Sequence, residues 1–175
     1  MEVIQLVQPT PLHKSALAEY LAAFPYSEDG IHGSSGLMFA DSIEHWLEEV
    51  ERSRHKETVK EGWVPAEQYI ALNDEQKVVG MLNLRKEVND YLLAYAGHIG
   101  YSVHPLYRQR GIGSHMLALA LKEAKKFGIH KVLITCTDHN QGSIGVIEHN
   151  GGILENKVID PGDNELTRRY WIEIK

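Results

Sequence analysis

The sequence predicts a single α/β domain in which a mixed central sheet of six to seven strands carries helices on both faces. The length of 175 residues is close to the usual size of one domain, so a single hydrophobic core is expected. Hydrophobic residues make up 43% and charged residues 24%, which is typical of a globular protein. Segments with helical spacing of apolar residues interleave with segments of strand pattern, as expected for helices packed around one sheet.

Helical spacing predominates in the first 65 residues, because apolar residues recur there every three or four positions. Asp41 or Ser42 can cap the second of the two expected helices. The intervening loop, rich in glycine and serine, is either a lid over a substrate or an ordinary connection. The elements expected here are a strand at Val3–Val7, a helix from Pro9–Pro11 to Ala23, a loop at 26–36 and a helix at Phe39–Arg54.

From Gln68 the pattern changes to strands separated by turns, with two further helices between them. Gly128 is suited to end the longer helix in the C′ position. Strand alternation before Val103 puts residues 97, 99, 101 and 103 on one face and residues 98, 100 and 102 on the other. The elements expected here are strands at Gln68–Leu72, Lys77–Arg85, Ala96–Val103, Lys131–Cys136, Ile153–Ile159 and Leu166–Ile174, and helices at Gly111–Phe127 and Gly142–Asn150.

Charge and composition exclude several classes of protein. The net charge of −6 argues against a general nucleic-acid binder, which needs a basic face, and is compatible with a cationic or amine substrate. The single cysteine, Cys136, cannot form an internal disulfide and fits a reducing compartment. No apolar run is long enough to span a bilayer, and the N-terminal segment does not resemble a secretory signal. We therefore expect a cytoplasmic protein.

One segment combines a strand end, a basic loop and a helix start: Val103-His-Pro-Leu-Tyr-Arg-Gln-Arg-Gly-Ile-Gly-Ser114. Amide N–H groups at a helix N-terminus have no partners within the helix, and the helix dipole adds partial positive charge. Gly111 and Gly113 let the backbone approach a ligand closely. Such a turn favours a phosphate or pyrophosphate, with Arg108 and Arg110 adding charge at its rim.

Two common phosphate-binding motifs do not fit this segment. A Walker loop requires Lys and Ser or Thr after its last glycine, whereas Ser and His follow Gly113. A dinucleotide-binding fingerprint requires a third glycine where this chain has Met116. What remains is Arg-x-x-Gly-x-Gly, formed by Arg108, Gly111 and Gly113; the alternative is a basic loop that only caps the helix.

This pattern resembles the acetyl-CoA-binding signature of the GNAT superfamily of N-acetyltransferases, Arg-x-x-Gly-x-Gly/Ala. That family has an Asn after the next strand, then a short helix and a glycine pair, and Asn140, Ser143 and Gly151-Gly152 match this order. The stretch 97–113, with Asn150 and the terminal Arg-Tyr-Trp-Ile, is similar to a bacterial subgroup of predicted acetyltransferases. The resemblance implies one GNAT-like domain over residues 1–175, with an acetyl-CoA-binding core at 97–152 and a variable acceptor-side region at 1–65.

The resemblance also implies how acetyl-CoA binds as co-substrate. Backbone amides of the glycine turn would hold the pyrophosphate, and the end of the preceding strand would pair with the pantetheine arm like an added strand. Asn140 and Ser143 would contact the far side of the cofactor, and a backbone N–H near Val103 would polarise the thioester carbonyl. The residues assigned to the cofactor are Ser102, Val103, His104, Arg108, Gln109, Arg110, Gly111, Ile112, Gly113, Ser114, Asn140 and Ser143.

An acetyl acceptor must lose a proton before it attacks, directly or through water. The family often places a Glu six residues before the strand-ending valine, and this chain has Gly97 there. His98 is adjacent and has an ordinary pKa of about 6.5, so it is the candidate base. The alternative interpretation of His98 is a buried histidine satisfied by a neighbour.

The proton donor to the departing thiolate also differs from the family pattern. Many members have a Tyr seven residues after the Asn, and this chain has Ile147 there. Tyr107, Tyr170 or a water can substitute, or the thiolate leaves unprotonated. The residues assigned to catalysis are His98, Tyr101 and Tyr107, although Tyr101 and His98 lie on opposite faces of their strand.

Together these features predict an acetyl-CoA-dependent N-acetyltransferase that acts by direct attack of a primary amine on a small molecule or peptide. Two alternatives remain: a non-catalytic acyl-CoA-binding module, suggested by Gly97 and Ile147, and a nucleotide-binding regulator that uses the 108–114 turn. No metal is expected, because among the ten histidines no His-x-x-x-His pair shares a helix face with a carboxylate at ligand spacing. We expect no nucleic-acid or membrane partner, and an exposed edge in the terminal strands is compatible with a homodimer.

Overall fold

The computed structural model describes residues 2–175 and contains one seven-stranded mixed sheet with helices on both faces, as the sequence predicts. The strand order is β1-β2-β3-β4-β5-β7-β6, and every neighbouring pair is antiparallel except β4 and β5. The strands are β1 (Gln5–Val7), β2 (Ala66–Leu72), β3 (Val78–Arg85), β4 (Ile99–Val103), β5 (Lys131–Thr137), β6 (Ile153–Ile159) and β7 (Leu166–Glu173).

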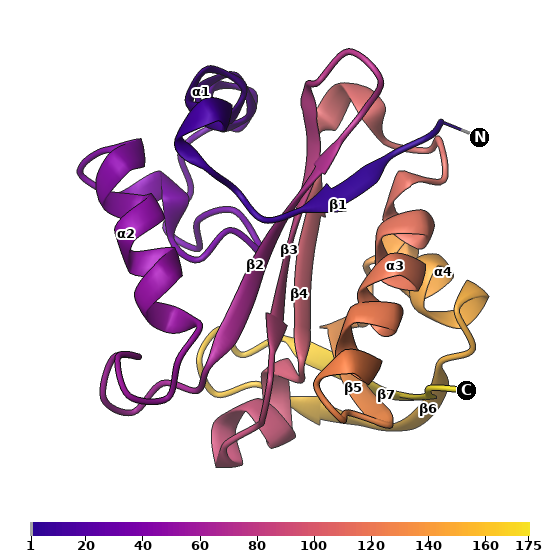
Figure 1. Cartoon of the computed structure of the whole chain (residues 1–175). Coiled ribbons are helices and arrows are strands. Elements are labelled where there is room, and N and C mark those ends of the chain that lie inside the picture. The colour runs from indigo at the N-terminus through magenta and orange to yellow at the C-terminus, as the bar shows by residue number, and fades with distance from the viewer. Residues whose placement is uncertain (1) are drawn as a thin grey trace.

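Helices pack on both faces of the sheet (Figure 1). α1 and α2 cover β2 and β3 on one side, and α3 and α4 pack on the other. The sheet therefore separates two hydrophobic clusters, one centred on Trp46 and Tyr20 and the other on Met116 and Tyr170. The helices are α1 (Lys14–Ala22), α2 (Ile43–Ser53), α3 (Ile112–Lys126) and α4 (Gln141–His149), with short turns at Pro11–His13, Leu37–Phe39, Leu92–Ala96 and Pro105–Tyr107.

Two element boundaries differ from the sequence expectation for identifiable reasons. The helix expected from Phe39 begins at Ile43, because the Ser42 hydroxyl accepts the His45 amide and caps α2 there. The strand expected from Ala96 begins at Ile99, because a π-helical turn and Gly97 with φ of 71° precede it. Gly128 has φ of 77° directly after α3, which confirms it as the C′ residue.

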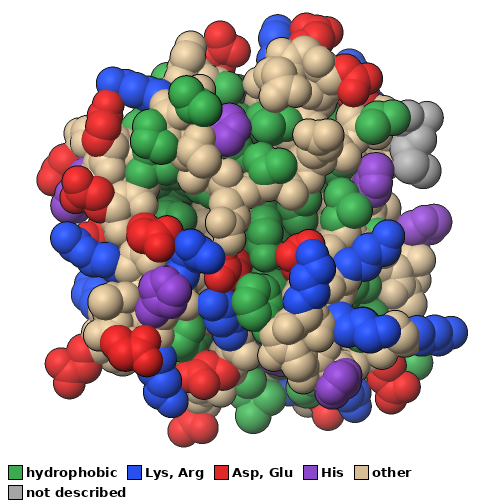
Figure 2. All heavy atoms as spheres, in the orientation of Figure 1, with side chains coloured by type: hydrophobic (Ala, Val, Ile, Leu, Met, Phe, Trp, Pro, Cys, Tyr) green, Lys and Arg blue, Asp and Glu red, His purple; other side chains and the backbone are tan. Residues whose placement is uncertain are grey.

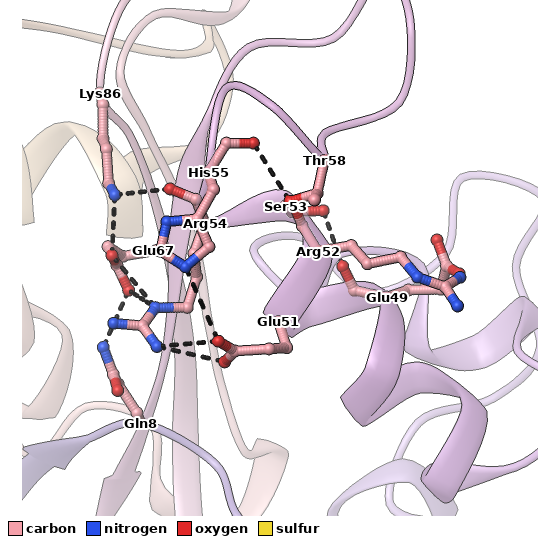
Figure 3. Close-up of polar contacts among 10 residues, drawn as sticks. All are labelled: Gln8, Glu49, Glu51, Arg52, Ser53, Arg54, His55, Thr58, Glu67 and Lys86. Atoms are coloured by element: carbon pink, nitrogen blue, oxygen red, sulfur yellow. Dashed lines mark hydrogen bonds and ion pairs between the residues drawn. The ribbon is translucent and has the colours of Figure 1, made fainter.

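Glu67 on β2 is a buried carboxylate surrounded by cations (Figure 3). Its side chain is 2% exposed and pairs with the Arg54 guanidinium at 3.0 Å and the Lys86 ammonium at 2.9 Å. The Gln8 amide donates a third hydrogen bond at 2.8 Å. Because Arg54 caps the end of α2 and Gln8 follows β1, this cluster ties α2 and the N-terminal segment to the sheet.

The surface gives few further indications of a partner. Figure 2 shows acidic and basic side chains interleaved over α2 rather than a surface of one sign. Within residues 2–175, no helix has the length and apolar character needed to cross a membrane. β6 forms one outer edge of the sheet and its residues are mostly exposed, so the homodimer remains a prediction.

Candidate active site

The turn between β4 and α3 presents a row of unpaired amides. Gln109 and Gly111 have φ of 62° and 79°, so the chain turns sharply just before α3 begins at Ile112. Among residues 2–175, the amides of 109–114 find no protein acceptor. Because these amides surround the N-terminus of a 15-residue helix, they form a site suited to a pyrophosphate.

Gly113 packs at the point where α3, α4 and β4 meet. A Cβ at this position would lie 3.1 Å from Val146 Cγ2 and 3.6 Å from Val103 Cγ2. The close contact with Val146 leaves no room for a branched side chain. A Cβ at this position would require Val146 to move by a few tenths of an ångström, so glycine lets the first turn of α3 pack against β4 and α4 without displacing them.

The two arginines of the motif have different environments. The Arg108 side chain donates to the Val103 carbonyl at 3.2 Å and is otherwise exposed. The Arg110 guanidinium lies 5.0 Å from the Tyr107 ring centroid and 3.7 Å from a Glu2 carboxylate oxygen. Arg110 is thus partly neutralised, and Arg108 is the cation at this turn without a carboxylate partner in the described chain.

β4 and β5 separate directly after a single paired position, Ile99 with Ile134. Antiparallel pairing makes alternate residues of β4 hydrogen-bond to β3. The His104 amide donates to Val79 at 2.9 Å, so His104 and, by alternation, Ser102 direct their backbone groups to β3. Of the three predicted pantetheine contacts, only Val103 has its backbone amide directed toward the gap. Tyr101 joins it there, which the sequence motif did not indicate.

Tyr101 spans this gap on the α4 side. Its hydroxyl donates to the Ser143 hydroxyl at 2.9 Å, and burial raises the pKa of Tyr101 to about 12. The Asn140 side chain accepts the Ser143 amide at 3.1 Å and caps α4. Cys136 is also buried here, and burial raises the pKa of its thiol to about 11, so the thiol stays protonated at neutral pH. The structure thus brings Tyr101, Ser143 and Asn140 together.

His98 lies on the opposite face of β4 from Tyr101, as alternation predicts. Its amide donates to the Leu133 carbonyl at 2.7 Å, and its Nδ1 accepts the Leu133 amide at 3.0 Å. An accepting Nδ1 requires the proton on Nε2, and burial lowers the pKa of His98. The neutral ring therefore joins β4 to β5 where the two strands begin to diverge, and its accepting nitrogen is already used.

Tyr107 lies outside the gap. Its ring packs edge-on against His104 at 5.2 Å and carries Arg110 on its face. Tyr107 also lines a small cavity with Tyr20 and Lys77, on the α1 side of the β4 end. The structure does not bring Tyr107 together with Tyr101 or Ser143.

The face of β4 toward α1 carries residues that no sequence motif indicated. The Ser102 hydroxyl shares a 2.8 Å hydrogen bond with the Tyr20 hydroxyl. Gly33 of the glycine-serine loop packs on Gly100, where a Cβ on Gly33 would lie 2.5 Å from the Gly100 carbonyl oxygen. Arg85 at the end of β3 lies beside the same glycine. Strand alternation was the one signal that could have placed Arg85 on this face.

The chain belongs to the acetyltransferase (GNAT) family, because residues 38–151 match the sequence model of that family. It is an acetyl-CoA-dependent acetyltransferase by family, as the Arg-x-x-Gly-x-Gly motif indicated. A search of curated proteins found no match. Family membership thus rests on the match over residues 38–151.

Solved structures confirm the fold along the whole chain. The ribosomal-protein-S5-alanine acetyltransferase from Vibrio fischeri has a TM-score of 0.70 at 17% identity, with 100% of this chain and 95% of that chain covered. The yncA protein from Salmonella typhimurium, assigned as an acetyltransferase and solved with acetyl-CoA, has a TM-score of 0.66 at 13% identity, covering 98% and 94%. A dodecameric spermidine N-acetyltransferase from Vibrio cholerae has a TM-score of 0.65 at 14% identity, covering 97% and 93%.

Proposed function

We propose that the protein transfers the acetyl group of acetyl-CoA to a primary amine on a small molecule or peptide. The observation that carries this proposal is the row of unpaired amides at 109–114, next to the open backbone edge of β4 where β5 diverges. A pyrophosphate would bind at the first feature and the extended, amide-containing pantetheine arm at the second; both are parts of CoA. The family assignment supplies the acetyl-transfer chemistry.

The binding residues follow from the free hydrogen-bonding groups. The amides of 109–114 would hold the pyrophosphate, and Arg108 would add charge beside it. The backbone of Tyr101 and Val103 would pair with the pantetheine arm as an added strand. Ser143 and Asn140 line the far side of the gap and would meet the same arm.

In the proposed reaction the amine nitrogen forms a bond to the acetyl carbon and the carbon–sulfur bond breaks. One proton leaves the amine and one proton reaches the CoA sulfur. Tyr101 is the donor we assign, because its hydroxyl lies at the gap between β4 and β5, reaches α4 and is protonated at neutral pH. It would thus fill the role of the family Tyr, whose position is occupied here by the buried Ile147.

For removal of the amine proton we favour a water chain over direct transfer to His98. The Nδ1 of His98 accepts the Leu133 amide, and its Nε2 carries the proton, so the neutral ring has no free lone pair. The burial that lowers its pKa also opposes a second proton on the ring. His98 then acts on the site through the geometry of β4 and β5.

The first experiment is calorimetric titration of acetyl-CoA into the purified protein, with ATP as the control ligand. We expect saturable binding of acetyl-CoA and none of ATP, followed by thiol release when a reactive amine is added. Binding of acetyl-CoA without thiol release for any amine would support the non-catalytic module that Gly97 and Ile147 suggest. Equal competition by ATP would instead support a nucleotide-binding regulator, and absence of acetyl-CoA binding would refute the cofactor site.

A further inference from the structure

Arg85 lies across the start of β4 on the face directed to α1 and α2. It is the last residue of β3, and its Nη1 donates to the carbonyls of Gly97 at 3.0 Å and Ala96 at 3.4 Å. Its Nη2 lies 3.8 Å from the position that a Cβ on Gly100 would occupy. The guanidinium thus sits beside β4 on the face opposite Tyr101, the face on which we place the acceptor.

The charge of Arg85 is not balanced within the described chain. Three other arginines have side chains no more than 30% exposed, namely Arg54, Arg168 and Arg169, and each forms an ion pair with a carboxylate. Arg85 forms none with any Asp or Glu of residues 2–175, and its Nε and Nη2 donate to no acceptor there. Burial lowers the pKa of Arg85, yet arginine keeps its charge at neutral pH. A half-buried guanidinium with free donors is suited to a carboxylate or similar oxyanion.

Two glycines lie close to the free Nη2 of Arg85. Gly33 and Gly100 approach each other beside it, with 3.6 Å from the Gly100 Cβ position to Gly33 Cα. The loop that carries Gly33 is fixed, because Gln68 donates to the Gly33 carbonyl at 2.7 Å and accepts the Ser35 hydroxyl at 2.6 Å. Gln68 is itself 2% exposed, so this loop is held against β2 and β4 rather than free.

We propose that Arg85 binds an oxyanion of the acetyl acceptor, so that the acceptor is an amine carrying a carboxylate, such as an amino acid. This inference rests on the proposed function. A polyamine does not fit the position, because a second ammonium would face the guanidinium at close range. The positive charge also disfavours the ammonium form of a nearby amine, which promotes its deprotonation in a site with no carboxylate at Gly97.

The test is a thiol-release assay at saturating acetyl-CoA with matched acceptors. The panel contains the L-amino acids, the amines that correspond to them without the carboxylate, and spermidine. We expect kcat/KM for the best amino acid to exceed that for its carboxylate-free amine by about 100-fold or more. Spermidine or the amines reacting as well as the amino acids would overturn the proposal, while the acetyltransferase function itself would stand.

Arg85→Gln should reduce kcat/KM for the amino acid about 100-fold, chiefly through KM, and change the value for the matched amine by less than about three-fold. Arg85→Lys keeps the positive charge but lacks the planar guanidinium that can donate two parallel hydrogen bonds. Its kcat/KM for the amino acid should lie between those of the parent and Arg85→Gln. Arg52→Gln removes the same charge from an exposed site on α2 and should leave the ratio unchanged. An equal loss on both acceptors in Arg85→Gln would indicate a merely structural role and contradict the proposal.

A direct binding measurement covers the case in which no panel member reacts. Succinate is titrated into the protein–CoA complex while the Arg85 Nε–H signal is followed by NMR. A saturable shift supports the oxyanion site, and its absence overturns it. Calorimetry with acetyl-CoA in the same sample reports on the cofactor site separately. Absence of acetyl-CoA binding would show that the proposed function fails, whereas absence of the succinate shift with normal acetyl-CoA binding would show that only the oxyanion site fails.

Discussion

Gly113 shows how a single residue can serve both packing and ligand binding. The space for its missing side chain is bounded by Val146 and Val103, and its amide belongs to the unpaired row. We predict that Gly113→Val moves the first turn of α3 away from β4 and lowers acetyl-CoA affinity at least about 100-fold. Calorimetry measures the affinity, and a melting curve checks that the variant is folded.

Gly145 provides a matched control for this substitution. It lies within α4, and no atom lies within 4 Å of the position its Cβ would take. Gly145→Val should therefore bind acetyl-CoA as the parent does. Normal affinity in Gly113→Val would show that the pyrophosphate site is elsewhere.

Tyr101 gives a second prediction at the residue scale. The phenol has a pKa of about 12 and stays protonated through the neutral range, so Tyr101→Phe removes a proton donor without changing the charge. We predict that kcat falls about 100-fold while KM for acetyl-CoA changes by less than about three-fold. Steady-state kinetics measure both values. Tyr26→Phe, at a side chain 75% exposed, is the control, and an unchanged kcat in Tyr101→Phe would exclude the assigned role.

At the scale of elements, the β4–β5 junction depends on the protonation state of His98. Burial lowers the pKa of His98 in the folded chain, so the unfolded chain binds more protons in acid. The stability that the neutral ring contributes is present above the ordinary pKa of about 6.5 and is lost as the pH falls below it. The free energy of unfolding should accordingly decrease between pH 7.5 and pH 5.

His98→Asn isolates this effect, because its Oδ1 can accept the Leu133 amide without titrating. We predict a smaller decrease in unfolding free energy for His98→Asn over the same pH range, measured by urea denaturation. The pKa of His104 is also lowered, by burial and by Arg108, so some decrease should remain. His32→Asn changes an exposed histidine and should follow the parent. Identical pH profiles for the parent and His98→Asn would contradict the proposed junction.

The cluster around Glu67 joins α2, the N-terminal segment and β2, so its loss would weaken the packing of all three. We predict that Glu67→Gln lowers the free energy of unfolding by about 2 kcal/mol. This is less than for a fully buried pair, because Arg54 and Lys86 are 30% and 24% exposed and can turn toward water. Urea denaturation measures it. Glu51→Gln breaks the exposed ion pair of Arg54 and should lower the free energy of unfolding far less than Glu67→Gln does.

Element types were predictable from the sequence, and their boundaries depended on contacts the sequence does not display. The helix at Gly111–Phe127 could be recognised because its apolar residues recur at helical spacing and Gly128 marks its end directly after the last of them. The start of β4 could not, because Gly97 adopts a positive φ only in the context of Leu133, whose carbonyl oxygen would lie 2.4 Å from a Cβ there. For the same reason the motif indicated the turn that we propose for the pyrophosphate but not Arg85, whose proposed role depends on a neighbouring strand.

At the scale of the whole molecule, the sheet consists of two parts that meet at the start of β4, through the strand pair Ile99 and Ile134 and the hydrogen bonds between His98 and Leu133. β1–β4 form one part, and β5–β7 form the other. A ligand that pairs with β4 and also contacts α4 would join these parts. Acetyl-CoA should therefore stabilise the fold beyond its local site.

We predict that acetyl-CoA at about 100 times its Kd raises the melting temperature by about 5–10 °C, because such a ligand adds about 2.7 kcal/mol to stability. Amide exchange should slow at Tyr101, Val103 and 109–114, the groups that the ligand covers, and also across the β4–β5 junction. ATP at the same concentration should produce neither effect. Thermal stabilisation without slower exchange at these amides would mean that acetyl-CoA binds elsewhere and that the gap between β4 and β5 is not its site.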